Sequence, residues 1–168
     1  MKEIAEKLAV SLTTHHFTLT TAESCTGGGV AWTLTQLPGC SAWFDRGYVT
    51  YHNQAKIDNL GVPETTLSEY GAVSMQVAAE MAEGALLNSY ADVAISVTGI
   101  AGPTGGSPEK PIGSVWFGVA VLNHSTVTCH QQFSGDRRAI QTQAIQFALT
   151  YTLEHLTQVI HTLESDVT

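Results

Sequence analysis

Basic residues are scarce in this sequence, which has seven lysines and arginines against fifteen aspartates and glutamates and a formal net charge of −8. A protein that binds nucleic acid through its phosphates needs a basic stripe, so this composition predicts no nucleic-acid partner. Charged residues of either sign make up only 13% of the chain, well below the usual share of about a quarter. A small phosphorylated ligand would therefore be held by backbone N–H groups and one or two cations rather than by a broad positive field.

Cysteine is also rare, and the N-terminus lacks a hydrophobic run. The three cysteines, Cys25, Cys40 and Cys129, form an odd set without a CxxC pair, which is typical of a protein kept in the reducing cytoplasm. The first 15 residues carry four charges and no apolar core of a signal peptide, so neither a secretion signal nor a membrane span is expected. The seven histidines show no metal-ligand spacing. We therefore predict a soluble cytoplasmic protein without a membrane contact.

The chain does have enough apolar material for a core. Its 168 residues are 43% hydrophobic, which suits one domain over residues 1–168, and no linker or internal repeat divides it. Apolar residues recur with a helical period at Ile4, Leu8 and Leu12, whereas aromatic and β-branched residues crowd 42–51, as in a strand. The pattern predicts helices over 2–15, 24–37, 53–60, 74–90 and 136–163, and strands over 17–22, 42–51, 92–97, 114–122 and 125–133.

The order of these elements predicts the fold. Helices and strands alternate at first, and a hairpin that turns at Asn123 and His124 comes late, so we expect an α/β protein with three layers, α/β/α, around a mixed central sheet. The last helix carries two apolar stripes, one able to face the sheet and the other either further core or, by a slight preference, a subunit contact. The first stripe holds Ile140, Ala144, Phe147 and Tyr151, and the second holds Leu149, Leu153, Leu156, Ile160 and Leu163.

Two glycine-rich loops follow strand-like runs. The first comes directly after Glu23 and places Ser24 at the break, and the second, 98–106, follows a strand that ends at Val97. Glycines let backbone N–H groups approach a ligand, and the start of a helix leaves such groups unpaired. If the two strands are parallel, both loops meet at one edge of the sheet, where open α/β sheets bind their ligands. The arrangement predicts a site for a phosphate or for the oxyanion that a serine nucleophile generates.

Three side chains near the first loop could perform acyl transfer. Ser24 needs a base, and no histidine clearly reaches this edge, His52 being the nearest. Lys56 falls in the first turn of a helix capped by Asn53, where the helix dipole and partial burial would lower its pKa toward that of a usable base. Tyr51 ends the preceding strand and could relay a proton or hold the amine, so a Ser–Tyr–Lys set could replace the usual Ser–His–Asp set. Which of Tyr51 and Lys56 is the base stays open.

Each of these residues also has a structural interpretation. A serine that opens a helix is most often an N-cap, a lysine in a first turn is usually solvated, and a tyrosine that ends a strand is usually core. Cys25 could be the nucleophile in place of Ser24, although cysteine is commonly a small buried apolar residue. Neither loop matches GxGxxG or GxxxxGK[ST], so no nucleotide-fold motif is supported. The residues by themselves predict a small-anion or amide-hydrolase site.

Several longer motifs resemble those of the C-terminal domain family of the competence/damage-inducible protein CinA, over about residues 5–155. They are TAESCTGG at 21–28, SAWFDRGYVTY at 41–51, GAVS at 71–74, GIAGP at 99–103, GG at 105–106, KPIGSVW at 110–116 and GDR at 135–137. The resemblance implies a three-layer α/β fold, the stand-alone form of the domain and frequent oligomerisation. It also implies a nicotinamide-nucleotide amidase, which converts nicotinamide mononucleotide and water to nicotinate mononucleotide and ammonia in pyridine-nucleotide salvage.

The resemblance also implies roles for individual residues. Ser24 would attack the carboxamide carbon, and Tyr51 and Lys56 would handle the proton and the ammonia that leaves. Backbone N–H groups would stabilise the oxyanion, either those of Thr26, Gly27 and Gly28 or those of Thr98 and Gly99. The ribose phosphate would be held by the rest of the second loop and by the start of the last helix, through Gly102, Gly105, Gly106 and Arg137. No metal or organic cofactor is implied.

One position departs from the family pattern, and two other functions stay open. Many members carry a second arginine four residues after Arg137, where this chain has Gln141, so phosphate affinity could rest on Arg138 instead. A non-catalytic sensor that binds a pyridine nucleotide or phosphate is the alternative function, favoured by the low charge content. It would signal through a homo-oligomer formed by the C-terminal helix. Hydrolysis of another small amide by the same residues is a third option.

Overall fold

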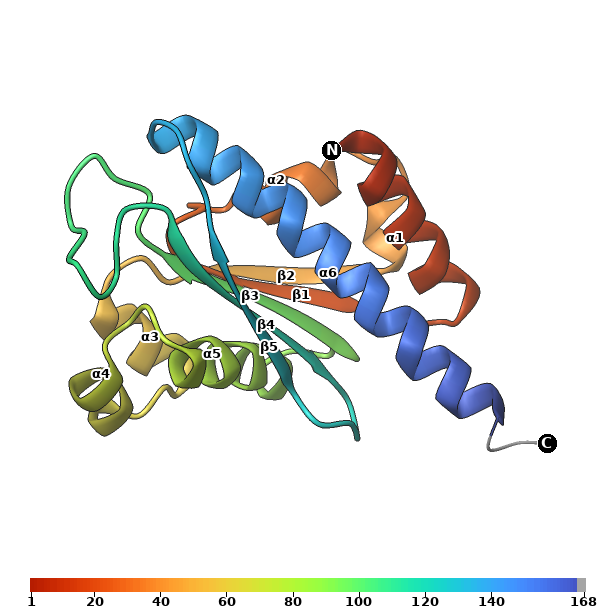
Figure 1. The fold of residues 1–168 in the computed structure, drawn as a ribbon. Helices are drawn as coiled ribbons and strands as arrows, with labels where there is room; N and C mark the ends of the chain where they lie inside the picture. The colour runs from red at the N-terminus through yellow and green to blue at the C-terminus, as the bar shows by residue number, and fades with distance from the viewer. Residues whose placement is uncertain (166–168) are drawn as a thin grey trace.

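The centre of the molecule is a five-stranded mixed sheet, which the structure, a computed structural model, describes together with its helices over residues 1–165. The strand order is β2-β1-β3-β4-β5 (Figure 1). β1 pairs in parallel with β2 and β3, whereas β4 is antiparallel to both β3 and β5. The bounds are β1 Leu19–Glu23, β2 Phe44–Val49, β3 Val93–Gly99, β4 Ser114–Val121 and β5 Val127–Gln132.

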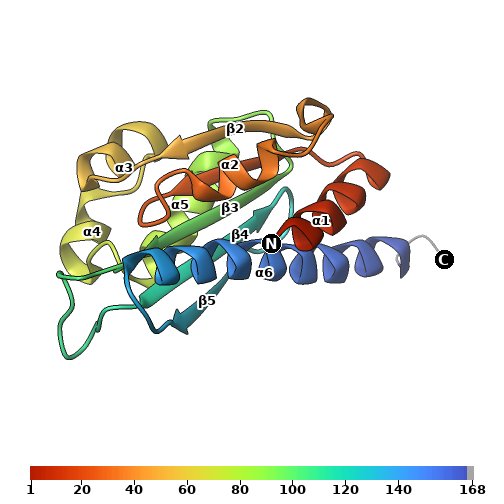
Figure 2. The same cartoon turned by 90° about the horizontal axis from the view of Figure 1, so that it is seen from above.

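Helices cover both faces of this sheet and give the molecule three layers (Figures 1 and 2). A short 3-10 helix, Cys40–Ala42, precedes β2. The predicted α/β/α fold with a mixed sheet is confirmed. Within residues 1–165, none of the helices combines the length and the hydrophobicity that crossing a bilayer requires. One face carries α1 (Lys2–Thr14), α2 (Gly29–Thr35) and α6 (Arg137–Ser165), and the other carries α3 (Asn53–Leu60), α4 (Glu64–Tyr70) and α5 (Met75–Leu87).

Each face of the sheet has its own core. Under α1, α2 and α6 the core contains large side chains such as Phe117 and Leu149, each of which contributes about 1.5–3 kcal/mol when it is fully buried. Under α5 alanines dominate the buried cluster, so this helix lies close to the strands. Gly84 lets α5 approach α3, because a Cβ atom there would overlap the carbonyl oxygen of Leu60. The position of α3, which carries Lys56, is therefore fixed by tight packing.

The first glycine-rich loop differs from the prediction. The helix expected to start at Ser24 starts at Gly29, and residues 24–28 form turns instead. The buried carboxylate of Glu23 holds the first turn of this helix, so the helix starts beside the end of β1 rather than as its continuation. Gly28 is the N-cap and has a φ of 94°, a left-handed conformation that glycine adopts without strain. Ser24 is therefore not the N-cap of this helix.

Two helices on the opposite face also differ from the prediction. The N-cap of α3 is His52 and not Asn53, because the His52 ring accepts a backbone N–H at 3.2 Å. The prediction lacked α4, which follows Pro63 and has no regular apolar period, since only Leu67 among its residues is buried. Proline at the N-cap and an acidic first turn were the signals available in the sequence.

Both apolar stripes of α6 pack inside one chain. In the second stripe Leu149, Leu156 and Ile160 are buried in the cluster that contains the leucines of α1, and only Leu163 is largely exposed, at 43%. The slight preference for a subunit contact along this stripe is therefore wrong at its buried positions. The stripe is core because α1 packs along α6.

Candidate functional site

The carboxyl ends of the parallel strands bring the predicted residues to one edge of the sheet. Ser24 follows β1, Tyr51 lies just beyond β2, and Gly99 is the last residue of β3. Because β1 is parallel to both of its neighbours, these three strands end at the same edge. The first turns of α3 and α6, which carry Lys56 and Arg137, come to this edge as well (Figure 1).

The side chains of Ser24 and Lys56 meet at this edge. The Lys56 Nζ atom lies 3.1 Å from Ser24 Oγ. It also donates to the carbonyl oxygens of Thr50, at 2.9 Å, and Tyr51, at 3.3 Å. Lys56 is 1% exposed and Ser24 is 8% exposed, so the amine is almost completely removed from water. The predicted serine and lysine are therefore in hydrogen-bond contact.

Burial determines the protonation state of this amine. Removal from water disfavours the ammonium and lowers the pKa of Lys56 from its ordinary 10.5 to about 8. A neutral amine has two N–H donors and one lone pair, and the carbonyl oxygens of Thr50 and Tyr51 can only accept. When these two carbonyls take both N–H groups, the lone pair is left for the Ser24 hydroxyl. The geometry thus suits a lysine that accepts the serine proton.

The phenol of Tyr51 has a different partner. Its oxygen accepts from Arg137 Nη2 at 2.5 Å, and the side chain is 53% exposed. The same guanidinium donates from Nη1 to the carbonyl oxygen of Gly102 at 2.8 Å. Within residues 1–165 the phenol makes no hydrogen bond to Ser24 or Lys56, and only the backbone carbonyl of Tyr51 reaches the lysine. Arg137 therefore connects the loops after β2 and β3 across the end of β1.

The start of α2 is already occupied by a carboxylate. Glu23 is fully buried and accepts from the backbone N–H groups of Val30, at 2.9 Å, and Ala31, at 2.8 Å. It also accepts from the Thr26 hydroxyl at 2.7 Å. These donors are not available to a ligand, so the expectation that the start of this helix offers them to an anion is wrong. Glu23 instead fixes the turn that carries Ser24.

Other backbone donors of this turn remain without an acceptor. The N–H of Gly27 donates to the Ser24 carbonyl, and that of Gly29 donates to the Thr26 carbonyl, both at 3.0 Å. The backbone N–H groups of Thr26 and Gly28 have no acceptor among residues 1–165. They lie two and four peptide units after Ser24, and free N–H groups in the turn that carries a nucleophile are suited to a developing oxyanion.

The end of β3 adds a further donor. The Ser24 N–H donates to the Val97 carbonyl at 2.9 Å, so Val97 faces β1, and residues two apart in a strand face the same neighbour. The N–H of Gly99 therefore points past the end of β1, toward Ser24, whereas that of Thr98 points toward β4. The Thr98 hydroxyl donates to the Ala72 carbonyl at 2.8 Å. Farther along the loop after β3, Gly105 and Gly106 are exposed to solvent.

Two residues close to Ser24 in space, Cys25 and Gln141, have structural roles that could not be assigned from the sequence. Burial raises the pKa of the Cys25 thiol to about 12, which makes this cysteine a poor nucleophile. The Cys25 carbonyl accepts from Gln141 Nε2 at 2.9 Å. In the sequence Gln141 was notable only because it stands where many family members carry an arginine. Its position one helical turn after Arg137 nevertheless places both residues on one face of α6.

Unpaired cations gather near this edge of the sheet. Three cations are bound to carboxylates, since Lys2, Lys7 and Arg46 contact Glu6, Glu3 and Asp45. Among residues 1–165 the other four have no carboxylate partner, and they are Lys56, Lys110, Arg137 and Arg138. All four lie in segments that follow the carboxyl ends of β2 and β3 or that start α6. An acidic protein thus keeps its unpaired positive charge beside the candidate site.

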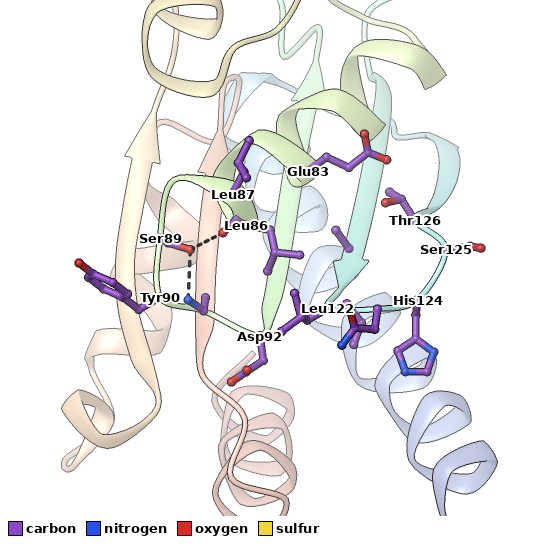
Figure 3. Close-up of a pocket in the computed structure, with 14 residues that line it drawn as sticks. Glu83, Leu86, Leu87, Ser89, Tyr90, Asp92, Leu122, His124, Ser125 and Thr126 are labelled. Atoms are coloured by element: carbon purple, nitrogen blue, oxygen red, sulfur yellow. Dashed lines mark hydrogen bonds between the residues drawn. The ribbon is translucent and has the colours of Figure 1, made fainter. Parts of the chain in front are cut away.

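A hollow of about 800 Å³ lies at the opposite, amino-terminal edge of β3 (Figure 3). It is lined by the end of α5, the loop before β3 and the turn between β4 and β5, and its side chains include Tyr90, Leu122 and His124. Its serines contact only backbone groups or nothing within residues 1–165. The hollow therefore has room for a ligand but lacks a nucleophile bound to a base.

The fold and the site define a three-layer α/β protein with a serine–lysine pair at the carboxyl ends of its parallel strands. The profile of the CinA C-terminal domain family matches residues 1–156. The chain therefore belongs to this family, as the motifs predicted.

The similarity extends over most of the chain. Nicotinamide-nucleotide amidohydrolase PncC from Enterobacter agglomerans is 53% identical over 153 residues, which cover 91% of this chain and 93% of that protein. PncC from Escherichia coli K12 is 50% identical over 149 residues, or 89% and 90% of the two chains. The crystal structure of competence/damage inducible protein CihA from Agrobacterium tumefaciens has a TM-score of 0.90 at 43% identity, over 93% of this chain and 94% of that one.

Proposed function

We propose that this protein hydrolyses the carboxamide of nicotinamide mononucleotide, giving nicotinate mononucleotide and ammonia, in cytoplasmic pyridine-nucleotide salvage. That the chain is an amidohydrolase follows from its relatives, several of which bear that name at 45–53% identity over most of its length. The observation that carries the proposal is the buried Lys56 amine 3.1 Å from the Ser24 hydroxyl. A small phosphorylated substrate also agrees with the three unpaired cations near this edge other than Lys56, which are Lys110, Arg137 and Arg138.

In the first step Ser24 Oγ attacks the carboxamide carbon while its proton passes to the Lys56 amine. The tetrahedral intermediate then collapses, the proton moves from Lys56 to the amide nitrogen, and ammonia leaves. The resulting ester between Ser24 and the nicotinoyl group is hydrolysed by a water molecule, which Lys56 deprotonates in the same way. This chemistry uses no metal and no organic cofactor.

The oxyanion of both intermediates is proposed to bind backbone donors around Ser24. The N–H groups of Thr26 and Gly28 have no acceptor in residues 1–165, and that of Gly99 points past the end of β1. Each donor of this kind is worth about 3 kcal/mol of transition-state stabilisation. Of the donors expected from the sequence, those of Gly27 and Thr98 are the less suited, because the first donates to Ser24 and the second faces β4.

The ribose phosphate is assigned to the second loop and the start of α6. Arg137 is anchored to Gly102 and Tyr51 and still has donors to offer, since a guanidinium carries five N–H groups. Arg138 is exposed beside it and supplies a second cation in place of the one lost at Gln141. The exposed backbone of Gly105 and Gly106 completes the proposed phosphate site.

Ammonia release from nicotinamide mononucleotide tests the proposal, with nicotinate mononucleotide detected directly by chromatography. We expect product from the wild-type protein and none from Ser24→Ala, which removes the nucleophile while its small side chain leaves the fold intact. Equal turnover in the variant would exclude Ser24 as the nucleophile. Turnover of another small amide but not of the mononucleotide would overturn the substrate assignment and retain the amidase chemistry.

A sensor that assembles into homo-oligomers is the second candidate. It is favoured by two apolar side chains near the end of α5, Leu87 and Tyr90, which are 85% and 87% exposed. Exposed apolar groups of this size suit a subunit contact better than the mostly buried stripe of α6 does. Sedimentation with and without nicotinamide mononucleotide tests this function, which requires saturable binding, a ligand-dependent change of mass and no product.

A further inference from the structure

The first two turns of α6 hold all three loops of the candidate site. Arg137 donates to the Tyr51 phenol and to the Gly102 carbonyl, in the loops that follow β2 and β3. Gln141 donates to the Cys25 carbonyl at 2.9 Å, in the loop that follows β1. The Arg137 contacts belong to the proposed phosphate site, but Gln141 is neutral and makes no hydrogen bond to Ser24 or Lys56 within residues 1–165. Its contact needs an explanation of its own.

The geometry of a peptide group supplies that explanation. In a trans peptide bond the C=O and the N–H point in opposite directions, and the bond between Cys25 and Thr26 is trans. Since the Cys25 carbonyl points at Gln141 on α6, the N–H of Thr26 points away from α6. The helix α3, which carries Lys56, lies on the other face of the sheet from α6 (Figure 1). The free Thr26 N–H therefore points toward the side from which Lys56 meets Ser24.

We infer that Gln141 is a positioning residue, which holds the Cys25 carbonyl so that the Thr26 N–H is fixed as a donor to the oxyanion. The inference deepens the proposed amidase function and rests on it. The Cys25–Thr26 peptide is the central peptide of the turn that the Gly27 N–H closes onto the Ser24 carbonyl, and that bond alone does not set which way a central peptide faces. Without the Gln141 contact the turn keeps the bonds from the Thr26 hydroxyl to Glu23 and from the Gly27 N–H to Ser24, but neither of them is made by the Cys25 carbonyl or the Thr26 N–H.

This role requires a hydrogen-bond donor at position 141 and does not depend on the charge of the side chain. An amide, a guanidinium or an ammonium can each donate to a carbonyl oxygen, whereas leucine cannot. Gln141→Leu removes the donor at similar volume, and Gln141→Arg restores a donor on a half-buried side chain that can extend to the surface. A matched control lies two residues along the same helix, where Gln143 donates to the carbonyls of Ser134 and Ala139 away from Ser24.

The experiment measures kcat and KM for nicotinamide mononucleotide in the wild type and these three variants, with melting temperatures to confirm folding. We expect Gln141→Leu to lower kcat by about 10- to 100-fold with KM within about twofold, because an oxyanion donor acts only in the transition state. Gln141→Arg should stay within about threefold of the wild type in kcat, and Gln143→Leu should be indistinguishable from it. A raised KM at unchanged kcat in Gln141→Leu, or an equal loss in Gln141→Leu and Gln141→Arg, would overturn the inference.

A second readout separates this inference from the substrate assignment. A fluorophosphonate reagent bonds its phosphorus to Ser24 Oγ and releases fluoride, and the developing charge on its oxygen needs the same donors. The labelling rate, followed by intact mass, should fall in Gln141→Leu and recover in Gln141→Arg. If the wild type does not hydrolyse the mononucleotide, the proposed substrate fails while this order of labelling rates still supports the positioning role. Equal labelling of Gln141→Leu and the wild type overturns that role whatever the substrate is.

Discussion

The two edges of the central sheet each carry a buried or half-buried acidic side chain and several polar groups, but within residues 1–165 they differ in that only the carboxyl edge places a buried lysine amine against a serine hydroxyl. At the amino-terminal edge the Asp92 carboxylate accepts from the Thr18 N–H at 2.8 Å and from its hydroxyl at 2.9 Å, beside a hollow of about 800 Å³. At the carboxyl edge Glu23 fixes a turn in a similar way, but the amine of Lys56 is also buried against a serine hydroxyl.

The comparison shows that the features that create a large hollow differ from those that create a site suited to catalysis. The hollow is large because the end of α5 and a hairpin turn leave surface uncovered, and its polar groups remain in contact with water. The serine–lysine pair is suited to proton transfer because the protein has removed the amine from water without giving it a carboxylate, which lowers the pKa of Lys56 to about 8. Desolvation of one amine therefore distinguishes the two edges more sharply than the volume of the hollow does.

The largest expected effect comes from removing that amine. Lys56→Met keeps the length of the side chain but leaves Ser24 without a base, and we expect kcat to fall by about 10³-fold, within the range of a lost general base. Tyr90→Ala, at the opposite edge, should leave kcat within about twofold of the wild type. Ammonia release under saturating substrate measures both. A loss of less than about tenfold in Lys56→Met would show that another group is the base.

The two carboxylates offer a matched comparison of stability with activity. Glu23→Gln leaves one acceptor oxygen for three donors, so we expect a loss of about 2–3 kcal/mol in the free energy of unfolding. Asp92→Asn should cost about 1–2 kcal/mol, because the asparagine oxygen can still accept from Thr18. Urea unfolding gives both values.

Activity should separate the same two variants. Glu23→Gln loosens the turn that carries Ser24 and should lower kcat as well as stability, whereas Asp92→Asn should lower stability alone. The comparison requires assays at a temperature where both variants are folded. Equal losses of kcat in the two variants would contradict a special role for the carboxyl edge.

The pKa of Lys56 predicts how activity depends on pH. With a pKa of about 8, the neutral fraction of the amine, and with it kcat/KM, should rise about tenfold between pH 7 and pH 9. Lys56→Arg should lose the activity and this dependence, since arginine stays protonated. A wild-type profile that is flat over this interval, or one that survives in Lys56→Arg, would contradict a neutral-amine role.

The free energy of unfolding should also depend on the titration of Lys56. The folded state loses the Lys56 proton near pH 8, whereas the unfolded chain keeps it up to about pH 10.4. Between these values the unfolded state binds more protons, so the free energy of unfolding should rise with pH. Urea unfolding across this interval measures the slope, and in Lys56→Met this contribution to the slope should disappear.

The sequence allowed the fold to be predicted, and also which residues meet at the candidate site, because both depend largely on local patterns. Alternating helix and strand periods defined the layers, and the serine after β1 and the lysine of α3 followed from strand ends and a first helical turn. The start of α2 could not be found in this way, since it is set by the Glu23 side chain reaching Val30 and Ala31. The Gln141 contact to Cys25 joins residues 116 positions apart and has no local signal.

The smallest expected effect concerns Tyr51, and it settles which residue acts as the base. Its phenol accepts from Arg137 and is half exposed, whereas Lys56 is buried against Ser24. Tyr51→Phe therefore removes one contact to Arg137 and should raise KM by about three- to tenfold with kcat within about threefold. The backbone carbonyl that holds the lysine is kept in this variant. A fall in kcat as large as that of Lys56→Met would instead assign the proton transfer to the phenol.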